Sequence, residues 1–164
     1  MSAVISVVIS VGMADYKTAK TPDLLLTAGL GSCIGICIHD PFLKVGGMAH
    51  IMLPTASGSL GGNPAKYADT ALELLLKEIS GMGANKSRLK AKIAGGAQMF
   101  SFPGKPPVLK IGDRNAEAVE QELKKHGIPL LVADVGGSFG RTIHFDVGTG
   151  ELRIRTINHG EKVV

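Results

Sequence analysis

The sequence has few aromatic residues, two cysteines and no apolar run long enough to cross a membrane. Aromatic side chains make up 4% of the 164 residues, so the stacking platforms used to bind single-stranded nucleic acid are scarce. No helix-turn-helix, zinc-finger or RNA-recognition signature accompanies the net charge of +4, and we expect no nucleic-acid partner. The apolar segment 4–11 is too short for a bilayer and lacks a basic leader. We therefore expect a β-strand there, with neither membrane insertion nor export.

The two cysteines, Cys33 and Cys37, lie four residues apart in one predicted strand. An extended chain separates such residues by about 13 Å, which is beyond disulfide reach. Free thiols are typical of the cytoplasm, where we expect the protein to act. A zinc site built from these cysteines with His39 and His50 is disfavoured, because strand spacing spreads the ligands beyond the roughly 2 Å bonds of zinc. We expect neither a metal nor a cofactor.

Composition and periodicity predict a single α/β domain over residues 1–164. Hydrophobic residues make up 45% and charged residues 20%, which is ordinary for a globular protein with one core. Strands outnumber helices and the early strands are joined as hairpins, which predicts an α/β sandwich with a mainly antiparallel or mixed sheet and two main helices. The predicted strands are 4–12, 24–28, 33–39, 44–52, 89–94, 130–135, 142–147 and 151–157, and the predicted helices are 64–81 and 115–126.

A glycine-rich turn that leads into a cysteine, with a histidine on the next strand, is a plausible construction for a thiol nucleophile. Cys33 begins a strand in which small or polar residues alternate with isoleucines, as in a half-buried strand. If His39 and Lys44 close the hairpin with the next strand, Cys33 lies directly opposite His50, with Cβ atoms roughly 4.5 to 5.5 Å apart. A bulge at the glycine pair 46–47 would shift this register.

From spacing alone, core packing and catalysis are about equally good interpretations of Cys33. Cys37 lies farther from the glycine turn on the same face and is interpreted as packing. We expect His39 to cap the hairpin beside Lys44. The Gly29-Leu30-Gly31 segment lacks the Lys-Ser/Thr pair and the helix that follow the glycines of a phosphate-binding loop, so a nucleotide site is disfavoured.

Six motifs occur in order along nearly the whole chain, from about residue 27 to residue 155. They are GLGSC at 29–33, MAHIMLP at 48–54, KYAD at 66–69, AKIAGGA at 91–97, IGDRN at 111–115 and DVGG at 134–137. With this combination the sequence resembles the CheD family of chemoreceptor glutamine deamidases. The joint occurrence is far more specific than any one glycine motif.

The resemblance implies a cysteine hydrolase that converts selected glutamines of bacterial chemoreceptors to glutamates. A Cys, His, Thr triad then falls on Cys33, His50 and Thr27. The resemblance also implies a fold shared with toxin-type deamidases. The implied partners are the cytoplasmic domain of a methyl-accepting chemoreceptor, as substrate, and a CheC-type phosphatase.

The expected chemistry is amide hydrolysis through a thioester. The imidazole of His50 activates the Cys33 thiol and protonates the departing ammonia, while Thr27 orients the imidazole. Backbone N–H groups from Gly31 through Ser32 to Cys33 are candidate donors to the tetrahedral oxyanion, because glycine permits a sharp turn. The same route would hydrolyse receptor methyl esters.

Two further residues belong to motifs and are weighed between structure and function. Tyr67 lies near the start of the first predicted helix, and Asn115 is interpreted as a cap of the second. The family pattern also makes both candidates to line the site. Two other function classes stay open: a non-catalytic adaptor that binds chemoreceptors or a CheC-type protein, and a different thiol enzyme such as a protease or an amine-transferring acyltransferase.

Overall fold

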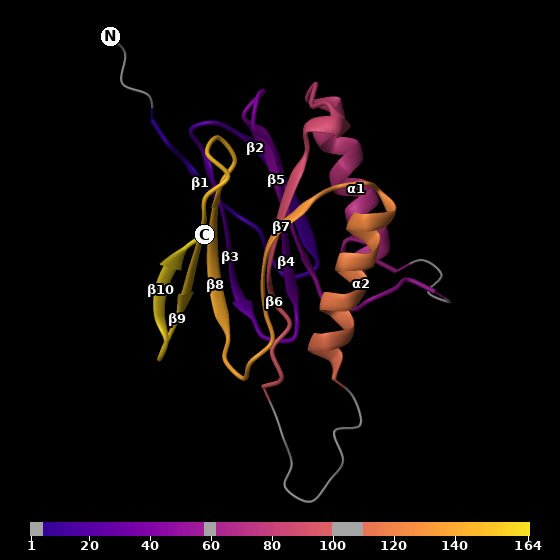
Figure 1. Ribbon diagram of the computed structural model, residues 1–164, viewed down its shortest axis with the longest axis vertical. Coiled ribbons are helices and arrows are strands. Elements are labelled where there is room, and N and C mark those ends of the chain that lie inside the picture. Colours follow the sequence, from indigo (N-terminus) through magenta and orange to yellow (C-terminus); the bar gives the residue numbers. More distant parts are fainter. Residues whose placement is uncertain (1–4, 58–61, 100–109) are drawn as a thin grey trace, which may run out of the picture.

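The computed structural model describes residues 5–57, 62–99 and 110–164. The described chain forms three layers, with two five-stranded sheets stacked face to face and two α-helices on the outer face of one sheet (Figure 1). This arrangement confirms the predicted α/β sandwich with two main helices. The strands, however, divide between two sheets, where the sequence predicted one.

The first sheet has the strand order β1-β3-β8-β9-β10. β1 pairs with β3 in parallel, and the other neighbours are antiparallel. The sequence did not predict β10, whose four residues are all exposed at the sheet edge, so that it shows no alternation of apolar and polar residues. The strands are β1 (Val8–Ser10), β3 (Leu24–Leu30), β8 (Arg141–Asp146), β9 (Leu152–Thr156) and β10 (Gly160–Val163).

The second sheet has the order β2-β5-β4-β6-β7, and its outer face carries the helices. β6 and β7 are parallel because α2 connects them as a crossover, and the other pairs are antiparallel. The sequence also did not predict β2, a largely polar edge strand. The strands are β2 (Asp15–Lys20), β4 (Ile34–Asp40), β5 (Val45–Ile51), β6 (Lys90–Gly95) and β7 (Leu130–Val135).

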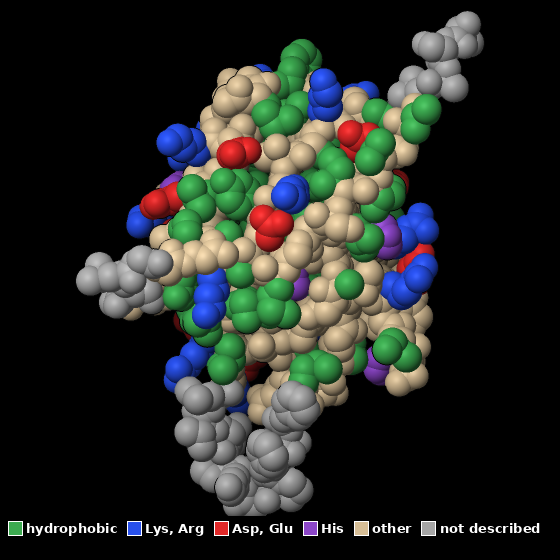
Figure 2. All heavy atoms as spheres, turned by 180° about the vertical axis from the view of Figure 1, so that it is seen from behind, with side chains coloured by type: hydrophobic (Ala, Val, Ile, Leu, Met, Phe, Trp, Pro, Cys, Tyr) green, Lys and Arg blue, Asp and Glu red, His purple; other side chains and the backbone are tan. Residues whose placement is uncertain are grey.

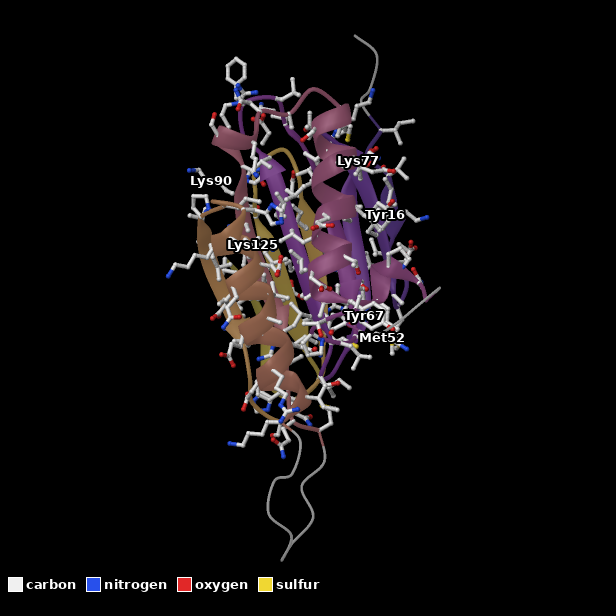
Figure 3. The ribbon with its side chains drawn as sticks, turned by 90° about the vertical axis from the view of Figure 1, so that its right-hand side faces the viewer. Tyr16, Met52, Tyr67, Lys77, Lys90 and Lys125 are labelled. Atoms are coloured by element: carbon white, nitrogen blue, oxygen red, sulfur yellow. The ribbon has the colours of Figure 1, made fainter. Side chains whose placement is uncertain are left out.

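The two α-helices, α1 (Ala68–Gly81) and α2 (Ile111–Lys125), lie side by side over the second sheet (Figure 3). Both predicted starts are wrong by four residues. Residues 64–66 form a separate 3-10 turn, η1 (Pro64–Lys66). Tyr67 has an extended backbone and separates this turn from α1. A second 3-10 turn, η2 (Lys86–Arg88), precedes β6. In the described ranges, no helix has the length and apolar character needed to cross a membrane.

The early start of α2 depends on one glycine. Gly112 has low intrinsic helix propensity, so its presence weakened the sequence signal for helix at this point. A Cβ at this position would lie 2.4 Å from the carbonyl oxygen of Gly96. Gly112 therefore lets the first turn of α2 approach the end of β6 closely.

Two hydrophobic cores hold the three layers together. One lies between the second sheet and the helices and includes the isoleucines of β4, and the other lies between the two sheets and includes Cys33 and Cys37. Both faces of β4 are therefore buried. Small and polar residues on β4 face the first sheet.

The register of β4 and β5 differs from the predicted one by two residues. Asp40 pairs with Val45, and Gly35 lies opposite His50, so the prediction that Cys33 is directly opposite His50 is wrong. A shift of two residues preserves the face of every side chain. Cys33 is therefore a diagonal neighbour of His50 on the face toward the first sheet.

The Asp40 carboxylate organises the turn between β4 and β5, which has the predicted length but is moved by one residue along the chain. It accepts hydrogen bonds from the N–H groups of Phe42 and Leu43 inside the turn, and from the N–H of Asn85. The guanidinium of Arg88 donates to both of its oxygens, with the shorter Nη2–Oδ2 distance at 2.7 Å. The Arg88 guanidinium, helped by these N–H donors, holds the pKa of this buried carboxyl well below its ordinary value of 3.8.

We expect Asp40→Asn to lower the free energy of unfolding by about 2 kcal/mol at neutral pH, since Arg88 is partly exposed and solvent screens the pair. Because the folded-state pKa of Asp40 is depressed, its contribution is present above the unfolded pKa near 3.8 and is lost as pH falls toward the folded value. Urea denaturation at several pH values measures the difference between wild type and variant. Glu120→Gln, at an exposed position on α2, is the control. A loss that stays constant down to the acid range would contradict this assignment.

Candidate active site

The candidate residues come from elements that meet at one end of the sandwich. The turn between β3 and β4, the end of β5 and the start of α2 lie at the lower end in Figure 1. Thr27 comes from the first sheet and His50 from the second, so the site lies between the sheets. Cys33 immediately precedes β4 at the same end.

Thr27 and His50 form a buried hydrogen-bonded pair. The distance from Thr27 Oγ1 to His50 Nδ1 is 2.7 Å, and each residue is 1% exposed. Oγ1 also donates to the carbonyl oxygen of Val11 at 2.7 Å. A hydroxyl has one proton, so Oγ1 accepts a hydrogen bond from Nδ1–H of His50. This arrangement selects the tautomer in which Nε2 carries the lone pair.

Nε2 of His50 is buried and has no hydrogen-bond partner among the described residues. Burial lowers the pKa of this imidazole from its ordinary value of 6.5. His50 is therefore neutral near pH 7, with an unprotonated nitrogen available as a base. Such an orphaned acceptor is uncommon in a folded interior and calls for an explanation.

A bulge in β3 follows Thr27. Thr27 pairs with Ile143 and Leu30 pairs with Arg141, so β3 has one extra residue between the two pairs. Gly29 takes a positive φ of 71° within the bulge. Thr27 and Leu30 consequently both face the interior, although they are three residues apart.

Cys33 is 7% exposed. Burial raises the pKa of its thiol above the ordinary value of 9.0, and a smaller opposing effect on this pKa comes from the backbone N–H of Cys33. The resting site therefore holds a neutral thiol and a neutral imidazole.

Gly35 lies opposite His50, and its lack of a side chain lets the first sheet pack closely against β4. A Cβ at this position would lie 2.6 Å from Ile143 Cδ1 and 3.7 Å from the methyl group of Thr27. The absent side chain thus lets the first sheet approach the His50 strand. As a result, residue 35 places no side chain between the diagonal neighbours Cys33 and His50.

Hydrogen bonds fix three consecutive carbonyl groups in the turn that leads to Cys33. The carbonyl of Gly31 accepts from the N–H of Ala97, and that of Cys33 accepts from the N–H of Gly96. Between them, the carbonyl of Ser32 accepts from the side chain of Asn115. The N–H of Gly31 itself donates to the carbonyl of Gly29 at 3.0 Å and is committed within the turn.

The glycines at the end of β6 are points of close approach. A Cβ on Gly95 would lie 2.1 Å from the carbonyl oxygen of Cys33. Arg141 was not singled out from the sequence. Its buried guanidinium donates to the carbonyl of Gly95 at 3.2 Å and to the carboxylate of Asp134 at 2.9 Å. In the sequence, the adjacent glycines were a signal of close packing near the Cys33 turn, whereas a single arginine gave no signal for Arg141.

Tyr67 and Asn115 occupy different surroundings. The fully buried Asn115 is in contact with the Cys33 turn. Tyr67 is 9% exposed, precedes α1 and forms a parallel bridge with Leu53; Figure 3 shows it beside Met52, just beyond β5. Tyr67 is thus near the His50 strand, on the side of the helices.

Cys37 and His39 lie farther along β4. Cys37 is fully buried and its pKa is strongly raised by burial, as in a packed, unreactive thiol. The expectation that His39 caps the hairpin beside Lys44 is wrong, because its ring is buried, lies edge-on to Phe145 and bonds the carbonyl of Val147 through Nδ1. In the parts of the chain that the structure describes, no three His, Cys, Asp or Glu side chains are grouped as metal ligands would be.

A groove of about 420 Å³ lies next to the bulge of β3, with Gly29, Met99, Phe139, Arg155 and Ile157 among its lining residues. Figure 2 shows basic and acidic side chains interspersed among apolar ones on the face seen from behind. Such a mixture differs from the continuous basic stripe that is typical of nucleic-acid-binding surfaces.

Comparison with known proteins gives a consistent result. The family model described as "CheD chemotactic sensory transduction" matches residues 52–156. A protein of Desulfitobacterium hafniense named "Probable chemoreceptor glutamine deamidase CheD" is 79% identical over 96% of this chain and 98% of its own length. The "Chemoreceptor glutamine deamidase CheD" of Halalkalibacterium halodurans is 52% identical over 96% of this chain and 98% of its own length.

Similarity to solved structures is weaker. The Bacillus licheniformis hypothetical protein YfiH has a TM-score of 0.41 and 14% identity, over 73% of this chain and 49% of that one. Proteins this different need share neither activity nor substrate. The family model, by contrast, matches more than half of the chain, and relatives align with nearly all of it. The chain therefore belongs to the CheD family.

Proposed function

We propose that this protein hydrolyses the side-chain amide of glutamine in bacterial chemoreceptors and leaves glutamate. The observation that carries the proposal is the hydrogen-bond chain from His50 through Thr27 to Val11, which leaves Nε2 of His50 unprotonated and without a partner among the described residues. The relatives named chemoreceptor glutamine deamidases support the substrate class.

In the proposed mechanism, Cys33 is the nucleophile and His50 is the general base. Nε2 of His50 takes the thiol proton while the sulfur attacks the carbonyl carbon of the amide. The imidazolium then gives this proton to the nitrogen of the tetrahedral intermediate, the C–N bond breaks and ammonia departs, which leaves a thioester. Water next attacks the thioester with His50 again as base, and the C–S bond breaks to release glutamate and the thiol.

Both tetrahedral intermediates carry a negatively charged oxygen that needs hydrogen-bond donors. We assign the N–H of Cys33 as one donor, because it belongs to the residue whose sulfur attacks the carbonyl carbon. The N–H of Ser32 is the second candidate. Gly31 shapes the turn but spends its own N–H on Gly29, so its contribution is conformational.

The wider proposal follows the family. The thioester route also serves receptor methyl esters, because water attacks the same acyl-enzyme in either case. We propose a CheC-type phosphatase as a partner, the cytoplasm as the compartment, no cofactor, and one deamidase domain over residues 1–164. The competing adaptor hypothesis predicts receptor binding without conversion.

Loss of the nucleophile is the first test. We expect Cys33→Ala to lower the conversion of glutamine to glutamate in a receptor cytoplasmic fragment at least about 1,000-fold, as measured by mass spectrometry. Cys37→Ala is the matched control, because it removes the other buried thiol of the same strand face. The control should keep its rate within about threefold. Unchanged conversion by Cys33→Ala would overturn the assignment, and binding without conversion by wild type would favour the adaptor.

The role of Thr27 is tested by an isosteric pair of variants. Thr27→Val keeps the shape but removes the hydroxyl that holds Nδ1 of His50, so we expect kcat to fall about 10- to 100-fold. Thr27→Ser keeps the hydroxyl and should stay within about fivefold of wild type. Steady-state kinetics on the receptor fragment measures both. Equal losses in the two variants would show that packing matters here and the hydroxyl does not.

The pH dependence follows from the two shifted pKa values. The reactive form of the pair holds one proton in total, so it exists between the pKa of His50 and that of Cys33. Burial lowers the first below 6.5 and raises the second above 9.0, which widens the active range in both directions. We expect kcat/KM to have its acid midpoint below 6.5 and its alkaline midpoint above 9.0. Iodoacetamide labelling of Cys33 that titrates well below 9.0 would instead reveal a preformed thiolate.

A further inference from the structure

Asn115 connects the two strands that carry the candidate nucleophile and base. Its Nδ2 group donates to the carbonyl of Ser32 and to the carbonyl of Met52, both at 2.9 Å. Ser32 directly precedes Cys33, and Met52 lies two residues after His50. The side chain is fully buried, and its two acceptors fix which end of the amide is the nitrogen.

These bonds lie where the ladder between β4 and β5 ends. The last pair of that ladder is Ile34 with Ile51, so Ser32 and Met52 are beyond it. Past this pair the two strands are no longer joined by the ladder. The amide of Asn115 bridges them from the helix layer.

The bond to Ser32 also sets the direction of a donor. A trans peptide group is planar, and its C=O and N–H point in opposite directions. Since Asn115 holds the carbonyl of Ser32, the N–H of Cys33 in the same peptide points away from Asn115. The bond from Ala97 to the carbonyl of Gly31 orients the N–H of Ser32 in the same manner.

We propose that Asn115 is a positioning residue, which holds the peptide between Ser32 and Cys33 so that its N–H faces the developing oxyanion. This inference rests on the proposed function. It replaces the interpretation of Asn115 as a helix cap, because α2 begins at Ile111 with Lys110 as its N-cap residue. A cap bonds the first turn of its own helix, whereas the amide of Asn115 donates to two other segments.

The test compares two reactions of the same thiol. Amide hydrolysis develops an oxyanion, but alkylation by iodoacetamide displaces iodide at a CH₂ carbon and develops none. We expect Asn115→Ala to lower kcat for the receptor fragment about 10- to 100-fold with KM within about threefold. Alkylation of Cys33 by iodoacetamide should stay within about threefold of the wild-type rate.

Val119→Ala is the matched control for a general loss of stability. Val119 is fully buried one helical turn farther along α2 and packs in the helix-side core. We expect this variant to lose thermal stability and to keep kcat within about twofold. Equal falls of kcat in both variants, or a parallel change of alkylation and kcat in Asn115→Ala, would overturn the positioning role.

A separate measurement does not depend on turnover. Slow hydrogen exchange of the Asn115 side-chain amide in wild type, seen by NMR, would support its two bonds to Ser32 and Met52, and fast exchange would refute them. If wild type converts no glutamine while this exchange is slow, the proposed function fails and the bridge stands. If wild type is active and Asn115→Ala equals it, the positioning role fails and the proposed function stands.

Discussion

The hydrogen bond between Thr27 and His50 joins the two sheets at the candidate site, and the other features of the site depend on it. It requires the sheets to approach closely at one end, because a threonine side chain is short. Gly35 permits this approach, since any side chain there would meet Ile143 of the first sheet. The bulge that follows Thr27 lies on the facing strand of the first sheet, β3. An imidazole of defined tautomer is thus obtained from packing between layers.

The sequence predicted the face of each candidate residue better than its register. The alternation along β4 correctly placed Cys33 and His50 on one face, because face depends only on residue parity. The register was wrong because a side chain, the Asp40 carboxylate, organises the turn with two N–H groups. Periodicity carries no information about such a bond. The family resemblance identified the same residues without any register.

Features that link distant segments could not be predicted from local pattern. The acceptor that fixes the Thr27 hydroxyl is a backbone carbonyl, that of Val11, and every residue has one. Asn115 is 83 positions from Ser32, and its polar side chain at the start of a helix first suggested a cap. The close approach of Gly112 to Gly96 is an example of a contact that the sequence pattern does not show. A glycine indicates that something comes close, and only the fold shows what it is.

A neutral resting pair has a chemical advantage for a site between two sheets. Separating charge to form a thiolate and an imidazolium costs free energy in a buried location, about 1.4 kcal/mol for each unit by which a pKa is shifted. In the proposed mechanism this cost is met only when a substrate carbonyl is present, since the proton transfer and the attack on carbon occur together. Until then Cys33 remains a thiol, which is far less prone to oxidation and alkylation than a thiolate. Burial therefore slows oxidation and alkylation of the free thiol more than it slows the attack on a bound substrate. This difference favours reaction with a substrate side chain that can enter the site.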